Sequence, residues 1–174
     1  MKNKIFKPVI SALFAAIICV ATILIQIPVT VRGGFINMVD CFELLSGIVL
    51  GPIYGFLAAG LGSALADVLF GYFTYAPATF LIKGLMALVV SLLFVKEREK
   101  YSIIKLLIFG VFAETIMVAG YFIYECFVLN YGLGAVAAIP GNIFQGIFGI
   151  VVNILLVQAI SKNIKLKNLL NWRD

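Results

Sequence analysis

Six ionisable side chains interrupt stretches that are otherwise apolar enough to cross a membrane. They are Asp40, Glu43, Asp67, Lys83, Glu114 and Glu125. Each such group costs about 2.5–3.5 kcal/mol on membrane-insertion scales, so it is expected to pair, to reach the membrane surface or to serve a function. Five of them fall in the outer half of the predicted spans, and Glu114 lies nearer the middle. The polar atoms therefore converge towards one side of the membrane.

Polar residues also recur at helical spacing, which places them on one face of each helix. These stripes are Glu114, Val118, Tyr121 and Glu125; Asn142, Gln145, Gly149 and Asn153; and Thr79 with Lys83, near a loop that carries Tyr72 and Tyr75. Three stripes at the outer ends of three helices predict a water-accessible cup. Its donors, acceptors and aromatic faces suit a small, polar, partly aromatic ligand.

Structural roles are open for the same residues. Asp67 and Lys83 are equally well explained as a buried ion pair, and Glu125 as a side chain that reaches the membrane surface. Asn142 and Gln145 are also of the type that bonds neighbouring membrane helices together. Arg32 suits either a lid over the cup or a lipid headgroup contact.

A different surface is predicted near the start of the chain. Small residues on one side of the first apolar stretch would let another helix approach closely, either within this chain or in a partner. They are Ser11, Ala12, Ala15, Ala16 and Cys19. The Gly47, Gly51, Gly55 and Ala59 series is similar, but Pro52 interrupts it, so a tight turn with close internal packing is expected.

Composition fixes the class of protein that must hold these residues. Of 174 residues, 63% are hydrophobic and 12% charged, against about 45–50% and about 25% in soluble domains. Mean hydropathy is +1.14, and no polar stretch is long enough for a second domain. We predict one all-α integral membrane domain over 1–174, and the net charge of +5 indicates membrane topology rather than nucleic-acid binding.

Six transmembrane helices are predicted. The first covers 8–27 and is expected to be retained, because it is long for a signal peptide and lacks a clear cleavage site. A short helix from Asp40 turns at Gly51-Pro52 into a helix over 53–71, and the others cover 77–95, 104–130 and 137–161. Eleven of the 13 basic residues then share one side, so the positive-inside rule predicts cytoplasmic termini. Those eleven are Lys2, Lys4, Lys7, Lys96, Arg98, Lys100, Lys105, Lys162, Lys165, Lys167 and Arg173.

Missing motifs narrow the function. The chain has no histidine, and none of the serine-hydrolase, zinc-protease or phosphate-loop motifs occurs. The three cysteines have no metal-like spacing, and a disulfide is not expected. We therefore expect no enzyme, no cofactor and no metal site, and any uphill transport would need an outside energy source or an ion gradient.

Several segments resemble the substrate-binding S component of energy-coupling factor (ECF) transporters, in the riboflavin-transporter-like subgroup. They are Gly34-Phe35-Ile36-Asn37 through Asp40, Leu50-Gly51-Pro52-Ile53-Tyr54-Gly55, Gly62-Ser63-Ala64-Leu65-Ala66-Asp67, Tyr75-Ala76-Pro77-Ala78-Thr79 and Lys83-Gly84. The resemblance implies a cell-membrane subunit that binds a vitamin from outside, under the loop joining the first two helices. It also implies docking of the first helix on a transmembrane T component coupled to two cytoplasmic ATPases. The docking face departs from the family's alanine triplet, because Val20 stands where a third alanine would fall.

Within the subgroup, the sequence is similar to members assigned to pyridoxine or hydroxymethylpyrimidine uptake, with riboflavin as the alternative. The predicted substrate-binding residues are Arg32, Asn37, Asp40, Asp67, Tyr75, Thr79, Lys83, Glu114, Tyr121, Glu125, Asn142 and Gln145. A stand-alone carrier coupled to protons or sodium through Glu114 or Asp67 is the main rival. A membrane enzyme acting on lipid ranks lower, because the chain offers no credible nucleophile or metal set.

Overall fold

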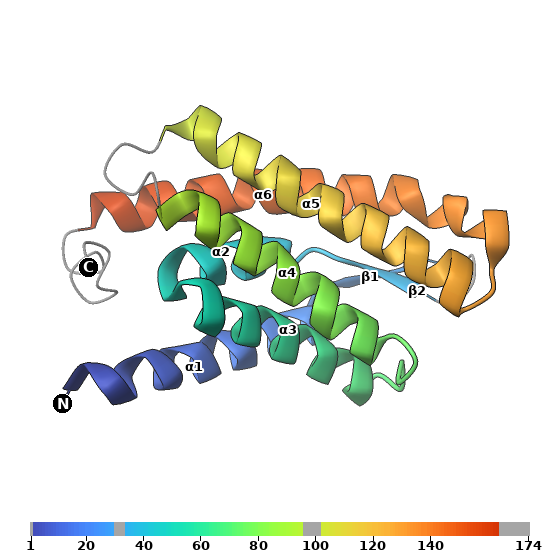
Figure 1. Cartoon of the computed structure of the whole chain (residues 1–174), viewed down its shortest axis with the longest axis horizontal. Helices are drawn as coiled ribbons and strands as arrows, with labels where there is room; N and C mark the ends of the chain where they lie inside the picture. The colour runs from blue at the N-terminus through green and yellow to red at the C-terminus, as the bar shows by residue number, and fades with distance from the viewer. Residues whose placement is uncertain (1, 30–33, 96–101, 164–174) are drawn as a thin grey trace.

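The computed structural model describes residues 2–29, 34–95 and 102–163, and within them the fold is a helical bundle with one small β-hairpin (Figure 1). The α-helices are α1 (Lys2–Leu24), α2 (Asp40–Leu50), α3 (Pro52–Leu69), α4 (Ala76–Val95), α5 (Ile103–Ile123) and α6 (Ile139–Lys162). Strands β1 (Gln26–Val29) and β2 (Gly34–Asn37) form the hairpin. A π-helical turn, Tyr124–Val128, and a 3-10 helix, Gly132–Ala138, connect α5 to α6.

The helix boundaries follow local sequence signals. Gly51 has φ = 85°, which favours glycine, and Pro52 starts α3 at a position where its missing N–H costs nothing. Ser102 caps α5 by accepting a hydrogen bond from the Lys105 N–H. The turn at Gly51-Pro52 and the short helix before it are confirmed as predicted.

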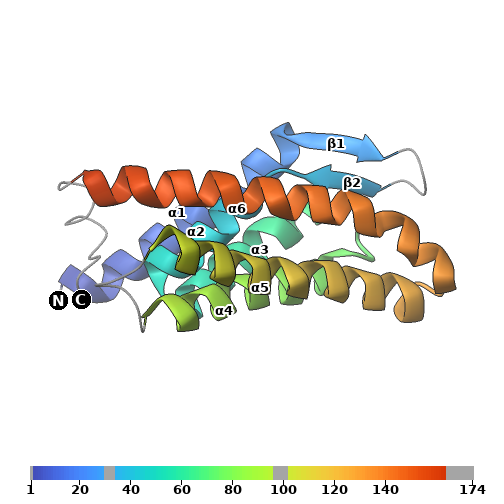
Figure 2. The same ribbon diagram turned by 90° about the horizontal axis from the view of Figure 1, so that it is seen from above.

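Two groups of connections define the two ends of the bundle (Figures 1 and 2). The start of α1, the end of α4, the start of α5 and the end of α6 gather at one end, which we call the terminal end. The β-hairpin, the turn between α3 and α4, and the α5–α6 connection lie at the other, which we call the hairpin end. Helix α2 occupies the half of the bundle nearer the terminal end.

Five helical segments are long and apolar enough to cross a membrane, among the residues that the structure describes. They correspond to α1, α3, α4, α5 with its π turn, and α6 with its 3-10 lead. Helix α2, at 11 residues, spans about 16 Å at 1.5 Å per residue, which is too short for a core of about 30 Å. Ten of its residues are buried where it packs against α3, α4 and α6, so α2 is the inner wall of the bundle.

The β-hairpin was not predicted. The first span was expected over 8–27, but α1 ends at Leu24, and strand β1 pairs antiparallel with β2 so that Gln26 faces Asn37. The loop expected over 31–39 therefore includes a strand. Pro28 and Val29 disfavour continuation of the helix, and the returning strand satisfies backbone groups close to the membrane. In Figure 2 the hairpin lies beside α6, which β2 contacts.

The fifth helix also ends earlier than predicted. Regular α-helix stops at Ile123 rather than near Asn130, and Asn130 has φ = 56°. The wider π turn moves Glu125 off the regular helical stripe expected from its spacing. The three cysteines are free, which agrees with the expectation of no disulfide.

Candidate functional site

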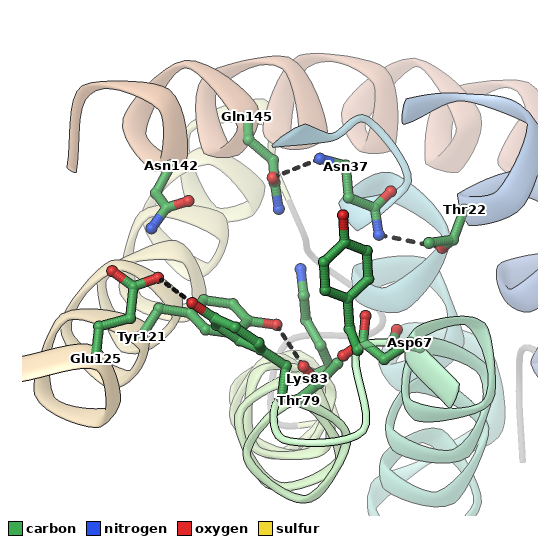
Figure 3. A pocket seen from close by; sticks show the side chains of 12 residues that line it. Thr22, Asn37, Asp67, Thr79, Lys83, Tyr121, Glu125, Asn142 and Gln145 are labelled. Atoms are coloured by element: carbon green, nitrogen blue, oxygen red, sulfur yellow. Dashed lines mark hydrogen bonds between the residues drawn. The ribbon is translucent and has the colours of Figure 1, made fainter. Parts of the chain in front are cut away.

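A polar cavity of about 90 Å³ opens near the hairpin end of the bundle. Side chains from α1, β2, α3, α4, α5, α6 and both connections at that end line it (Figure 3). They are Thr22, Asn37, Ser63, Asp67, Tyr72, Tyr75, Thr79, Lys83, Tyr121, Glu125, Asn142 and Gln145. The apolar core of the bundle surrounds this polar patch, so the site is a small polar chamber inside a hydrophobic protein.

Lys83 supplies the positive charge of the cavity, and two carboxylates beneath it already pair with that charge. Its Nζ lies 2.5 Å from Oδ1 of Asp40 and 3.0 Å from Oε2 of Glu43. All three side chains are almost fully buried, and Ser63 donates a hydrogen bond to Oε1 of Glu43 at 2.7 Å. Removing any one member of such a buried ion cluster would leave an uncompensated charge. The cluster is therefore stable only when the ammonium, both carboxylates and their hydrogen-bond donors are all present.

Gln145 joins this cluster to the hairpin. Its Nε2 donates to both oxygens of Asp40 at 2.9 Å, and its Oε1 accepts from the Asn37 N–H at 2.8 Å. Asn37 in turn donates through Nδ2 to Thr22 on α1 at 3.1 Å and accepts from the Val39 N–H. The predicted role of Gln145 as a bond between helices is therefore realised in the structure, beside its place in the cavity wall.

A second chain of contacts links α5, α4 and α3. The Tyr121 hydroxyl donates to Oγ1 of Thr79 at 3.1 Å, and Thr79 is hydrogen-bonded to the carboxylate of Asp67. Oδ2 of Asp67 has no hydrogen-bond partner among the described residues, and Asp67 is only 5% exposed. A buried carboxylate oxygen without a donor is costly unless a ligand or water completes it.

Aromatic residues form the outer rim of the cavity. Tyr75 packs edge to face on Tyr72 and Tyr124, with ring centroids 6.4 and 5.9 Å apart. The Tyr124 hydroxyl donates to the Thr74 carbonyl, and that of Tyr75 donates to Glu125 at 3.3 Å. Burial, reinforced by the nearby Glu125 carboxylate, raises the pKa of Tyr75 above its ordinary value. Tyr75 therefore stays a neutral donor at physiological pH.

Nine of the predicted site residues line this one cavity. They are Asn37, Asp67, Tyr75, Thr79, Lys83, Tyr121, Glu125, Asn142 and Gln145. Asp40 lies beneath the cavity wall and holds Lys83 and Gln145. Arg32 lies outside the described residues. Thr22, Ser63 and Tyr72 line the cavity but were absent from the predicted set. A single hydroxyl in an apolar helix, as at Thr22 and Ser63, carries little signal in the sequence, and Tyr72 was placed only in the loop beside the predicted cup.

Glu114 does not line the polar cavity, which corrects its placement in the predicted cup. The carboxyl of Glu114 fits between α5 and α6 because residue 149 is a glycine. A Cβ atom added to Gly149 would lie 3.2 Å from Oε1 of Glu114 and 2.8 Å from Cβ of Asp40. The Glu114 carboxyl lies beside that of Asp40, and no N–H or O–H donor among the other described residues reaches either of its oxygens. Glu114 also borders a separate apolar groove on the outer side of α5 and α6. Tyr121 lines the cavity, whereas Glu114 lies about two helical turns earlier on α5 and does not reach it.

The predicted ion pair between Asp67 and Lys83 is not formed. In the described part of the chain, Lys83 pairs with Asp40 and Glu43 instead. Their position at the start of α2, next to α4, brings both carboxylates to the lysine. This pairing has no local signature, because 43 residues separate Asp40 from Lys83 along the chain.

The structure divides the small-residue surface of α1 into two faces. Ser11 and Cys19 are buried; Ser11 donates to the Tyr54 carbonyl on α3, and a Cβ on Gly62 would lie 2.6 Å from the Ala15 carbonyl. Ala12 and Ala16 are exposed on the outer side. Ser11 and Cys19 are therefore buried within the chain, which corrects their assignment to a partner-docking face. Ala12 and Ala16, with the half-buried Ala15 beside them, stay a predicted docking face.

Comparison with known proteins gives three likenesses. The family model for the S component of ECF-type riboflavin transporters matches residues 2–162. A Pyrococcus woesei protein, described as an uncharacterized protein in the gap 3′ region, is 35% identical over 147 residues, covering 84% of this chain and 96% of that protein. The solved S component of a bacterial ECF transporter matches with a TM-score of 0.71 and 24% identity, covering 93% of this chain and 98% of that one. At 24% identity, this last match shows a shared fold.

Proposed function

The chain belongs to the S-component family of ECF transporters, and from this premise we propose that it captures a small water-soluble vitamin from outside the cell and delivers it to an ATP-driven module. The family consists of membrane-embedded, substrate-binding transport subunits rather than enzymes. The observation that carries the proposal is the polar cavity, in which Asp67, Lys83 and Gln145 converge within an apolar bundle. Concave sites with a few convergent polar groups are the usual form of small-molecule sites.

The preferred substrate is pyridoxine or hydroxymethylpyrimidine. A buried water needs about 10–15 Å³, so a cavity of this size corresponds to about six to nine water molecules. That volume is closer to a single substituted ring than to riboflavin, which has three fused rings and a ribityl chain. The aromatic rim at Tyr72 and Tyr75 supports a planar ligand, because offset and edge-on ring contacts are favourable. Riboflavin is the alternative, and it would need the rim to open.

Orientation follows from charge. We propose that both termini are cytoplasmic, that the chain crosses the membrane six times with α2 as the short inner member, and that the hairpin end faces outward. The basic residues support this, because eleven of 13 lie in the sequence within or next to the helix ends that gather at the terminal end. The cavity would then open to the outside, where a vitamin is captured.

Partners are proposed from the family. A transmembrane T component and two cytoplasmic ATPases would supply energy, which this chain's sequence does not provide through any phosphate-loop motif. The outer face of α1 at Ala12 and Ala16 supports close approach of a T-component helix. An ATPase module dedicated to this chain and one shared with other S components both fit the proposal.

A stand-alone ion-coupled carrier is the second candidate. The buried carboxylates of Asp40, Glu43 and Glu114 favour it, because intramembrane carboxylates are common in proton-coupled carriers. Uptake into vesicles by this protein alone, abolished by an uncoupler, would favour the carrier. Uptake that needs the T component and ATP hydrolysis would favour the S component.

The test is to identify what the protein binds. Small molecules released by denaturing the detergent-purified protein are analysed by mass spectrometry, and each compound found is titrated by calorimetry. We expect a pyridine or pyrimidine at near-stoichiometric amounts. The matched control is Asn142→Trp, which fills the cavity from a half-buried position on α6 and should abolish binding while the protein elutes normally in size exclusion. A protein that carries no ligand and ignores a vitamin panel would contradict the proposal.

A further inference from the structure

Among the residues that the structure describes, carboxylates outnumber cations around the cavity. Lys83 is the cation that lines it among the described residues, and both Asp40 and Glu43 already pair with that ammonium. Asp67 and Glu125 add two more carboxylates to the wall itself. Because the lysine's charge is compensated from below, the described part of the cavity wall presents carboxylate oxygens to a ligand, with Asp67 the more deeply buried of the two.

Asp67 is the carboxylate whose contacts are incomplete. It projects from α3 towards the cavity (Figure 3), is only 5% exposed and is hydrogen-bonded to Thr79. Its Oδ2 has no partner among the residues that the structure describes. Glu125, by contrast, is half-buried and accepts from the Tyr75 hydroxyl. An unpartnered carboxylate oxygen beside a small cavity is a position for a donor on the ligand.

We propose that Asp67 accepts a hydrogen bond from an amino group or a protonated nitrogen of the ligand, so that the site selects a small aromatic base over its oxygen analogue and over its phosphate ester. This proposal rests on the proposed function and names the chemical class of its substrate. A donor on the ligand would give Oδ2 of Asp67 the hydrogen bond that it lacks. A carbonyl or ether oxygen of the ligand at the same position would instead place two hydrogen-bond acceptors against each other. Hydrogen bonds to a charged group are about twice as strong as neutral ones.

The same charges exclude a phosphate. A phosphate monoester carries about −1.5 to −2 charges at pH 7. In this cavity it would approach Asp67 and Glu125, while Lys83 is held by Asp40 and Glu43 at 2.5 and 3.0 Å. No other basic residue lines the cavity within the described ranges. Selection against the phosphorylated form therefore follows from the residues that select the base.

The experiment compares probes that differ in one group. Purified protein in detergent is titrated with 4-amino-5-hydroxymethyl-2-methylpyrimidine, its 4-oxo analogue and its monophosphate ester, and with pyridoxine as the other proposed substrate. We expect the aminopyrimidine to bind at least about 10-fold more tightly than its 4-oxo analogue, and the phosphate ester to bind at least about 10-fold more weakly than the free alcohol. In Asp67→Asn, the affinity for the amino compound should fall about 10- to 100-fold.

The matched control is Glu114→Gln, which alters a buried carboxyl that does not line the cavity. It should change the affinity less than about twofold. Equal losses in Asp67→Asn and Glu114→Gln would overturn the proposal, because they would indicate a general effect of altering a buried carboxyl group. If Asp67→Asn does not fold, the ranking of probes on the unmodified protein decides: preference for the oxygen analogue or the phosphate ester overturns the proposal while leaving vitamin binding intact. Absence of binding by every probe contradicts both this proposal and the substrate class above.

Discussion

Lys83 is the residue through which most of the buried polar contacts are joined. It pairs with Asp40 and Glu43, and Asp40 also holds Gln145. Removing one member of a buried ion cluster leaves uncompensated charge and costs about 3–5 kcal/mol. We therefore predict that Lys83→Met lowers the stability of the detergent-solubilised protein by this amount, measured by thermal unfolding.

Neutralising the partners at the same time provides the control for Lys83→Met. The triple variant with Asp40→Asn and Glu43→Gln has no uncompensated charge, so it should recover most of the lost stability. A single Lys83→Met variant as stable as the unmodified protein would mean that the two carboxylates are already neutral.

Glu114 leads to the opposite prediction. Its carboxyl lies outside the polar cavity and beside that of Asp40, and no N–H or O–H donor among the other described residues reaches either of its oxygens. Glu114→Gln keeps the shape and removes the possibility of a buried charge beside Asp40. We expect the dissociation constant for the vitamin to change less than about twofold and the melting temperature to stay equal or rise, since relief of a buried charge is stabilising. A loss of affinity above about 10-fold would return Glu114 to the ligand site.

The α2–α3 helical hairpin depends on close backbone contact. A Cβ on Gly55 would lie 2.7 Å from Cα of Gly47, and it would meet backbone that has little room to shift. Overpacking of this kind costs about 1–3 kcal/mol. We predict that Gly55→Ala lowers the stability by about that amount in thermal unfolding. Gly84→Ala serves as comparison, because its Cβ would meet the ring of Phe56, a side chain that can move, and equal costs at both positions would contradict this account.

Helix α1 gives a prediction for assembly. Ala16 is exposed on the outer side of α1, whereas Ala15 is half-buried and its carbonyl approaches Gly62 of α3. Ala16→Trp should therefore block co-purification with a T component and its ATPases while leaving the vitamin affinity unchanged. Ala119→Trp makes the same change at an exposed alanine on α5 and should not affect assembly. Normal assembly of the Ala16→Trp variant would show that this face of α1 is not the docking surface.

The helices could be predicted from the sequence, but the hairpin could not. Apolar stretches and the Gly51-Pro52 and Pro77 signals place α2, α3 and α4 within two residues of their observed bounds. Strands β1 and β2 have four residues each, too few to show an alternating pattern, and their pairing depends on contacts with α6. The π turn at Tyr124 is likewise set by packing and has no signature of its own.

Predictions about the site succeeded where one helix determines a residue's position and failed where the packing of several helices determines it. Helical spacing brought Thr79 with Lys83, and Asn142 with Gln145, to the correct faces, because it depends on one helix at a time. The pairing of Lys83 with Asp40, and the placement of Glu114 behind Gly149, depend on how three helices pack. A single sequence carries no information on such contacts, since the residues involved are far apart along the chain.

Membrane orientation is the last prediction, and it concerns the whole chain. The distribution of basic residues predicts that the hairpin end faces outward. Leu133 lies in the α5–α6 connection at that end and is 85% exposed, so a cysteine there should react from outside. We predict that, in a Cys126→Ser background, Leu133→Cys in intact cells is labelled by a membrane-impermeant maleimide. A cysteine at Lys105, near the terminal end, should be labelled only after the cells are opened. The reverse pattern would invert the proposed orientation and move the cavity to the cytoplasmic side, where it could not capture a vitamin from outside.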